Sequence, residues 1–225
     1  MMKGIKVKIC GITNVEDMNL VADAGADCAG VLFELPSPRS VPAGKAVELS
    51  RSAKLPVFLL LFDAALDRAL EIIGLVEPAA LQLQGNESPD FVKDLKRSFE
   101  GKVWKAVHLP ADGSEGVDTK KVLDDMGLYI EAGADGFVLD SVVSIPGGKQ
   151  MGGTGKVHDW NASREIVESV DRPVFLAGGL RPENAHQAVY AVRPFGVDVS
   201  SGVESSVGKK SAAKVNAFIK KARMC

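Results

Sequence analysis

Short runs of aliphatic and β-branched residues alternate with longer segments of helical periodicity from one end of the chain to the other. Apolar runs of this length are typical of buried strands, whereas apolar residues repeated every three or four positions are typical of helices packed against a sheet. The expected strands are Ile5–Cys10, Cys28–Phe33, Pro56–Phe62, Ala80–Gln84, Lys102–Val107, Gly136–Asp140, Pro173–Ala177 and Val197–Ser200. The expected helices are about Val15–Ala24, Pro42–Ala53, Ala64–Leu75, Pro89–Phe99, Thr119–Ala132, Ser163–Val170, Pro182–Ala191 and Lys209–Ala222.

Strands and helices that alternate in this way predict an α/β fold with a parallel sheet. Eight strand–helix units favour a closed (β/α)8 barrel over an open doubly wound sheet, which has fewer strands and often a G-x-G-x-x-G turn after the first one. No such turn follows Ile5–Cys10, and no break in composition divides the chain. We therefore expect one (β/α)8 TIM-barrel domain over residues 1–225.

Composition and charge narrow the class of protein. Hydrophobic residues make up 46% of the 225 residues and charged residues 25%, which is the balance of a packed globular domain. Since 27 Lys+Arg oppose 29 Asp+Glu for a net charge of −2, no basic field favours a nucleic acid or a membrane surface as a partner. Lys3, Lys6 and Lys8 interrupt the apolar core that a secretory signal needs, and three cysteines make no disulfide framework, so we expect a cytoplasmic protein.

The chemistry of a (β/α)8 barrel lies where its strands end, so the residues at those positions are the candidates for a site. Two glycine-bearing segments, Gly178-Gly179 and Ser200-Ser201-Gly202, follow the last two expected strands. Their backbone N–H groups can approach an anion closely, and this is where such barrels commonly bind phosphate. Gly153-Thr154-Gly155, after the sixth expected strand, could close over the same group, although any one of these segments could also be an ordinary turn.

Three side chains at the same rim could act on a substrate. Asp140 ends the sixth expected strand and could serve as a general acid if its surroundings raise its pKa. Cys10 ends the first, where a thiolate could act as a base or nucleophile, although a single cysteine can also be inert packing. Arg39 follows Ser37-Pro38 and could bind a carboxylate or simply be solvated. Three scattered histidines and no carboxylate cluster predict no metal site.

Seven segments in order along the chain resemble one enzyme family, that of phosphoribosylanthranilate isomerase, a barrel of tryptophan biosynthesis. These segments are Lys8-Ile9-Cys10-Gly11-Ile12-Thr13, Ser37-Pro38-Arg39, Leu81-Gln82-Leu83-Gln84-Gly85, Leu139-Asp140-Ser141, Gly152-Gly153-Thr154-Gly155, Leu176–Asn184 and Gly196–Glu204. The family usually has histidine where this chain has Gln84, and an aromatic residue where it has Ser40. The resemblance therefore covers the acid, the base and the phosphate loops, while the departures fall on the ring-binding side.

The resemblance implies a cofactor-free Amadori rearrangement of N-(5′-phosphoribosyl)anthranilate, a small phosphoribosyl substrate that is the expected partner. Asp140 would protonate the furanose ring oxygen, Cys10 would remove the C2′ proton, and Arg39 would hold the anthranilate carboxylate. The phosphate would be held by Gly153, Thr154, Gly155, Gly178, Gly179, Ser200, Ser201 and Gly202. A paralogue acting on another phosphosugar and a non-catalytic phosphometabolite-binding barrel are the alternatives, and the chain could be a monomer or a homodimer.

Overall fold

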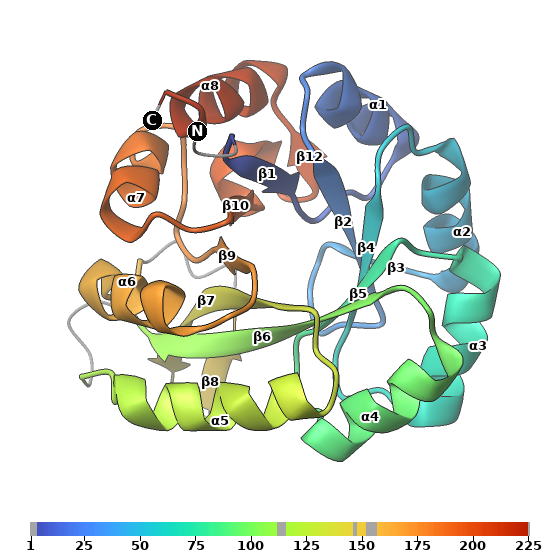
Figure 1. The fold of residues 1–225 in the computed structure, drawn as a ribbon. Helices are drawn as coiled ribbons and strands as arrows, with labels where there is room; N and C mark the ends of the chain where they lie inside the picture. The colour runs from blue at the N-terminus through green and yellow to red at the C-terminus, as the bar shows by residue number, and fades with distance from the viewer. Residues whose placement is uncertain (1–3, 112–115, 146–147, 152–156, 225) are drawn as a thin grey trace.

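Parallel strands closed into a ring form the centre of the computed structural model, which describes residues 4–111, 116–145, 148–151 and 157–224 (Figure 1). The ring order is β1-β2-β4-β5-β6-β7-β9-β10, and β1 closes it by pairing with β10 on one edge and β2 on the other. These strands are β1 Lys6–Ile9, β2 Cys28–Phe33, β4 Val57–Leu61, β5 Ala80–Leu83, β6 Lys102–Pro110, β7 Gly136–Ile145, β9 Val174–Leu176 and β10 Gly196–Val199. The expected (β/α)8 barrel is thereby confirmed.

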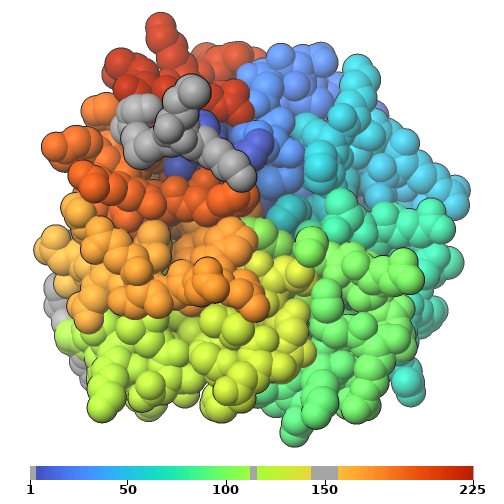
Figure 2. Space-filling view, in the orientation of Figure 1, coloured from blue at the N-terminus to red at the C-terminus, as the bar shows by residue number. Residues whose placement is uncertain are grey.

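The helices surround the ring, and along the chain one helix follows each strand of the ring, as expected (Figure 1). They are α1 Val15–Asp23, α2 Ala43–Ser52, α3 Leu66–Val76, α4 Pro89–Ser98, α5 Thr119–Glu131, α6 Trp160–Ser169, α7 Ala185–Val192 and α8 Ala212–Ala222. The first and last segments of the chain lie side by side on one face of the molecule, as closure of the ring requires (Figure 2). No helix in the described ranges combines the length and the apolar character needed to cross a membrane.

Local sequence explains where several helices begin. The Asn14 side chain accepts a hydrogen bond from the backbone N–H of Asp17 at the start of α1, and Ser88 does the same for α4, with Pro89 at the first helical position. Asp159 caps α6, which therefore begins at Trp160 and not at the expected Ser163. Short polar side chains satisfy the first N–H groups of a helix, which have no partner inside it.

Two further expected helix starts were wrong because hydrogen bonds hold the backbone there in a turn in one case and in a pair of strands in the other. Helix α7 begins at Ala185, and not at Pro182, because the Asn184 side chain bonds both the N–H of Arg181 and the carbonyl of Gly179 in a turn. Lys209–Lys210 forms β12, which pairs with β11 (Glu204–Ser206), so α8 begins only at Ala212. Two further short strands, β3 (Ser40–Val41) and β8 (Gly148–Met151), extend the sheet beyond the ring.

Two distinct packed regions support the barrel. Apolar side chains on the outside of the strands meet the helices in the larger region, which includes Ile9, Leu59 and Phe137. Inside the ring, aromatic side chains fill one end: the ring centroids of Trp104 and Phe175 are 5.0 Å apart, and Phe58 lies 5.6 Å from Trp104. Polar side chains can therefore occupy only the other end of the interior.

A buried histidine makes the stability of this fold sensitive to acid. His158 is 1% exposed, and among the described residues neither of its ring nitrogens has a hydrogen-bond partner. Burial, opposed by the charge of Asp159, lowers its pKa from 6.5 to about 4. The unfolded chain therefore binds a proton at His158 over a pH range in which the folded chain does not, and stability falls as pH drops from about 6.5 towards 4.

When the pH is lowered from about 8 to about 5, we expect the unfolding free energy of the wild-type protein to fall by about 2 kcal/mol more than that of His158→Gln. The reason is that the variant has no side chain at position 158 that takes up a proton on unfolding. Urea unfolding of both proteins at the two pH values measures the difference. His186→Gln, on the exposed surface of α7, is the matched control and should follow wild type. Equal pH dependence in wild type and His158→Gln would contradict the assignment.

Candidate active site

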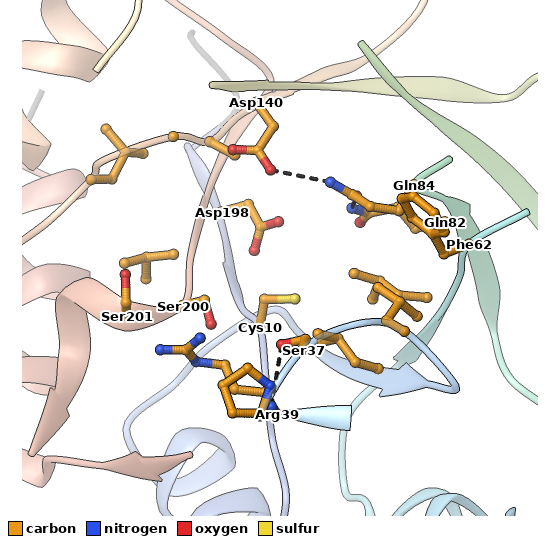
Figure 3. Close-up of a pocket in the computed structure, with 18 of the residues that line it drawn as sticks. Cys10, Ser37, Arg39, Phe62, Gln82, Gln84, Asp140, Asp198, Ser200 and Ser201 are labelled. Atoms are coloured by element: carbon orange, nitrogen blue, oxygen red, sulfur yellow. Dashed lines mark hydrogen bonds between the residues drawn. The ribbon is translucent and has the colours of Figure 1, made fainter. Parts of the chain in front are cut away.

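A cavity of about 660 Å³ opens at the carboxyl ends of the strands, and its two sides differ in chemistry (Figure 3). The apolar side is lined by Leu32, Leu35, Pro36, Pro38, Leu60 and Phe62. The polar side is lined by Gly178, Gly179, Ser200 and Ser201. Cys10 lies between the two sides because β1, which it follows, pairs with β2 on one edge and with β10 on the other.

Cys10 is a free thiol with 6% of its surface exposed. It has room there because β2 carries Gly30, where a Cβ atom would come within 2.5 Å of the Cys10 sulfur. Burial raises the pKa of the thiol to about 11, although the charges of Lys8 and Lys210 act in the opposite direction. The thiol is therefore the main form of Cys10 at neutral pH, and the two ammonium groups favour its thiolate.

Asp140 lies across the cavity from Cys10, with Asp198 between them (Figure 3). One oxygen of Asp140 accepts the N–H of Ser141 at 2.8 Å, and the other accepts the side-chain amide of Gln84 at 3.2 Å. Burial raises the pKa of the Asp140 carboxyl, although the charge of His108 on β6 opposes this shift. A raised pKa keeps a carboxyl protonated closer to neutral pH, which is what a general acid requires.

An ion pair that was not expected from the sequence joins β1 and β10 next to these two groups. Lys8 is fully buried, and its ammonium lies 2.7 Å from Asp198 and 3.0 Å from the Gln82 side-chain oxygen. Against the effect of burial, Asp198 raises the pKa of Lys8, so the ammonium is charged. The available signal was a charged residue at an inward position within each of two apolar strands, Lys-Val-Lys-Ile and Gly-Val-Asp-Val.

Asp198 has a further acceptor that faces the site. One of its oxygens binds Lys8, while Oδ1 is buried and has no hydrogen-bond partner in the described part of the chain. Because Asp198 lines the cavity, Oδ1 is available to a donor on a bound molecule. Burying an acceptor without a partner costs free energy, so such an atom favours a ligand that brings an N–H or O–H.

Two of the three glycine-bearing loops expected at the site line the cavity. Gly178 adopts a positive φ of 76° and lies against β7, where a Cβ atom would come within 2.8 Å of the backbone nitrogen of Ser141. Ser200 and Ser201 line the cavity, and Gly202 follows them in a short 3₁₀ turn packed against the Leu180 carbonyl. Gly153, Thr154 and Gly155 lie outside the described residues.

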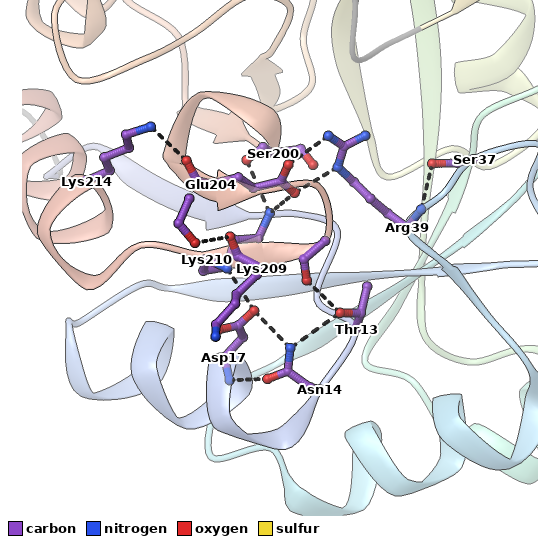
Figure 4. Close-up of polar contacts among 12 residues, drawn as sticks. Thr13, Asn14, Asp17, Ser37, Arg39, Ser200, Glu204, Lys209, Lys210 and Lys214 are labelled. Atoms are coloured by element: carbon purple, nitrogen blue, oxygen red, sulfur yellow. Dashed lines mark hydrogen bonds and ion pairs between the residues drawn. The ribbon is translucent and has the colours of Figure 1, made fainter.

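Arg39 lines the cavity, but it is not simply solvated (Figure 4). Its Nε and one terminal nitrogen donate to the two oxygens of Glu204 at 2.8 and 2.7 Å. Glu204 also accepts from the buried ammonium of Lys210 at 3.0 Å, and that ammonium donates to the Ser200 carbonyl. Although burial opposes it, Arg39 and Lys210 lower the pKa of Glu204, so the carboxylate is charged. One edge of the Arg39 guanidinium is used by Glu204, and the edge formed by its two terminal nitrogens remains for a second carboxylate.

No group of three or more His, Cys, Asp or Glu side chains within the described ranges is arranged to hold a metal ion. The polar groups that line the cavity are one thiol, two carboxyls, two amides, one guanidinium, the Ser37 hydroxyl and the loops on its polar side. Such groups can exchange protons with a bound molecule and hold its anionic ends.

Comparison with known protein families agrees with this geometry. Residues 7–221 match the family model described as N-(5'phosphoribosyl)anthranilate (PRA) isomerase. The chain belongs to the phosphoribosylanthranilate isomerase family. It is 37% identical over 224 residues to the N-(5'-phosphoribosyl)anthranilate isomerase of Natronomonas pharaonis, an alignment that covers 98% of this chain and 99% of that one.

Solved structures of phosphoribosylanthranilate isomerases share the fold. A structure described as monomers generated from the dimeric enzyme of Thermotoga maritima has a TM-score of 0.81 and 31% identity, and covers 98% of this chain and 100% of its own. Another, a complex with reduced 1-(o-carboxyphenylamino)-1-deoxyribulose 5-phosphate, has a TM-score of 0.80 and 30% identity, with the same coverage. The resemblance found in the sequence motifs is thus confirmed at the level of the family.

Glu204 holds the buried cation Lys210 and the partly buried cation Arg39, so we expect Glu204→Gln to lower the unfolding free energy by about 3 kcal/mol, since it leaves the charge of Lys210 uncompensated. Urea unfolding at neutral pH measures the loss. Glu183→Gln is the matched control: Glu183 is exposed and lies 3.7 Å from Arg181, so its loss should cost less than about 1 kcal/mol. Equal stability of the two variants would contradict the role given to Glu204.

Proposed function

We propose that this chain catalyses the Amadori rearrangement of N-(5′-phosphoribosyl)anthranilate to 1-(2-carboxyphenylamino)-1-deoxyribulose 5-phosphate. The observation that carries the proposal is the two-sided cavity with a thiol and a carboxyl between its sides. The substrate has the same order of parts: an aromatic ring with a carboxylate, a sugar in the middle, and a phosphate at the far end.

Each part of the substrate would meet cavity residues of complementary chemistry. The aromatic ring would pack against the apolar side, for example Leu60 and Phe62, with its carboxylate on the free edge of Arg39. The phosphate would accept hydrogen bonds from the loops at Gly178–Gly179 and Ser200–Gly202, and from Gly153–Gly155. Asp198 Oδ1, the free buried acceptor, would receive the N–H that joins the ring to the sugar.

This placement brings the sugar between the acid and the base. Protonated Asp140 donates its proton to the furanose ring oxygen, the C1′–O bond breaks, and an iminium forms between C1′ and the anthranilate nitrogen. Cys10, as thiolate, takes the proton from C2′, and the electron pair of that C–H bond neutralises the iminium to an enolamine. The enol hydroxyl then loses a proton and C1′ gains one, which gives the ketone.

Cys10 must be deprotonated to act as the base, whereas Asp140 must be protonated to act as the acid. Burial favours the protonated form of both groups, which suits Asp140 but leaves Cys10 with a pKa of about 11. The ammonium groups of Lys8 and Lys210 favour the thiolate, and the positive charge of the iminium adds to their effect at the moment when the proton must be removed. The order of steps proposed above, with ring opening before proton abstraction, follows from this electrostatic requirement.

The chemistry of the cavity walls weighs against the alternatives. A phosphosugar with phosphates at both ends would require a second phosphate-binding loop opposite Gly178–Gly179, where the described lining offers apolar side chains of β2 and β4 and a single cation, Arg39. A non-catalytic binding barrel would have no need of a buried thiol facing a partly buried carboxyl. We expect a cytoplasmic enzyme, acting as a monomer or a homodimer.

Cys10→Ser and Asp140→Asn should each lower kcat by about two to four decades, the usual contribution of a positioned acid or base. Loss of anthranilate fluorescence, with the substrate generated enzymatically, measures turnover. Cys28→Ser is the matched control, because Cys28 is also a buried free thiol but does not line the cavity, and it should keep near-normal kcat. Near-normal rates in the first two variants would refute the roles, and inactive wild-type protein would refute the reaction.

Arg39→Lys should lower kcat/KM for phosphoribosylanthranilate about 10- to 100-fold, because an ammonium cannot offer two parallel donors to a carboxylate while retaining Glu204. The decarboxylated analogue, N-phosphoribosylaniline, separates this effect from general damage to the site. Wild type and variant should process the aniline compound with similar kcat/KM. If the substitution penalises both substrates equally, Arg39 does not bind the carboxylate.

A further inference from the structure

A chain of hydrogen bonds crosses the barrel interior from β1 to the acid on β7. The Lys8 ammonium donates to Gln82 at 3.0 Å, Gln82 donates to Gln84 at 2.7 Å, and Gln84 donates to Asp140 at 3.2 Å. Lys8, Gln82 and Gln84 are 0%, 2% and 6% exposed. Because Gln82 and Gln84 are two residues apart on β5 and just after it, both side chains point into the barrel.

The direction of this chain is determined by its first member. An ammonium has only donors, so the side-chain oxygen of Gln82 must face Lys8 and its NH₂ must face Gln84. The Gln84 oxygen then faces Gln82, and its NH₂ is left for Asp140. A glutamine amide can otherwise turn over at little cost, and here the buried charge of Lys8 selects one orientation for both.

The main chain of Gln84 is held as well. A ring nitrogen of His108, Nε2, lies 2.8 Å from the Gln84 carbonyl oxygen, and since a carbonyl only accepts, Nε2 carries the hydrogen. Gln84 is therefore restrained at its backbone by β6 and at its side chain by Gln82. Its amide is a preoriented donor aimed at Asp140, not a side chain that happens to lie nearby.

Asp140 gains a defined geometry from this donor. Ser141 N–H occupies one oxygen and the Gln84 amide occupies the other, so the acidic hydrogen is confined to the lone pairs that neither donor uses. The charged and titratable groups that also act on Asp140 are His108 from β6 and Asp198 from β10. A donor on the carboxyl favours its ionised form, so Gln84 also limits how far burial raises the pKa of Asp140.

We propose that Gln84 is a positioning residue for the acid Asp140, and that Gln82 transmits to it the orientation imposed by Lys8. The proposal rests on the proposed function in so far as Asp140 is the proton donor. It predicts that the two glutamines act in series: once Gln84 has lost its amide, changing Gln82 should have no further effect on Asp140.

Three variants test whether Gln82 acts on Asp140 only through Gln84: Gln84→Met, Gln82→Met and the double variant. The matched control is Gln187→Met, on the exposed surface of α7. Methionine keeps the length of the side chain and removes the amide. Carbon-13 NMR titration of aspartate-labelled protein, assigned with Asp140→Asn, reports on Asp140 without any turnover. We expect the Asp140 titration to move to higher pH in both single variants and no further in the double variant, and to stay at the wild-type pH in Gln187→Met.

Turnover provides the second readout. We expect kcat to fall about 100-fold in Gln84→Met, because a misplaced reacting group costs about this much rate. The acidic limb of the pH profile of kcat should move to higher pH by the same amount as the Asp140 titration. Gln84→His, which retains a ring N–H donor, should recover most of the rate. An unchanged Asp140 titration in folded Gln84→Met, or additive effects of the two glutamine substitutions, would overturn the proposal.

The two proposals fail separately. Wild-type protein that does not turn over phosphoribosylanthranilate would refute the proposed function, while the NMR titration would still decide whether Gln84 acts on Asp140. If Gln84→Met does not fold, the titrations of Gln82→Met and Gln84→His decide the matter. An Asp140 titration in Gln82→Met equal to that of wild type would then overturn the proposal.

Discussion

The ion pair between Lys8 and Asp198 is the interaction on which the rest of the site depends. An ammonium fully removed from water costs several kcal/mol unless other groups compensate its charge, so every neighbour of Lys8 is constrained. Asp198 supplies the opposite charge at 2.7 Å, Gln82 an acceptor at 3.0 Å, and the face of Phe58 lies 5.5 Å below. Asp198 of this pair lines the cavity, and Phe58 packs against Trp104 and Phe175 in the aromatic cluster inside the ring.

A second group of buried charges organises the rim. Glu204 joins Arg39, from the loop after β2, to Lys210, from the hairpin after β10, and Lys210 in turn holds the backbone at Ser200 (Figure 4). The side proposed to bind a carboxylate and the loop proposed to bind a phosphate are thereby joined by one network of hydrogen bonds. Donors that are already oriented need no reorganisation when an anion arrives. The net charge of −2 is compatible with anion binding because these charges act locally.

Burial has opposite consequences for the two groups proposed to move protons. It raises the pKa of Asp140 and of Cys10 alike, which assists an acid and hinders a base. Lys8 therefore serves both: its charge favours the Cys10 thiolate directly, and its orientation of the two glutamines determines the donor that reaches Asp140. A single buried cation is thus paired with Asp198, favours the thiolate of the proposed base, and is linked to the proposed acid through two glutamines.

The sequence alone was enough for the order of strands and helices and for the rim positions of Cys10 and Asp140. These follow from local periodicity and from the rule that parallel strands end together at one edge. It was not enough for Lys8, which as a charge near the amino terminus suggested only a non-apolar segment. Lys8 and Asp198 are 190 positions apart, and Arg39 and Glu204 are 165 apart. Only closure of the ring, with the register that pairs Lys8 with Asp198, decides which charges share the interior, because no local pattern records what a strand at the other end of the chain will bring beside it.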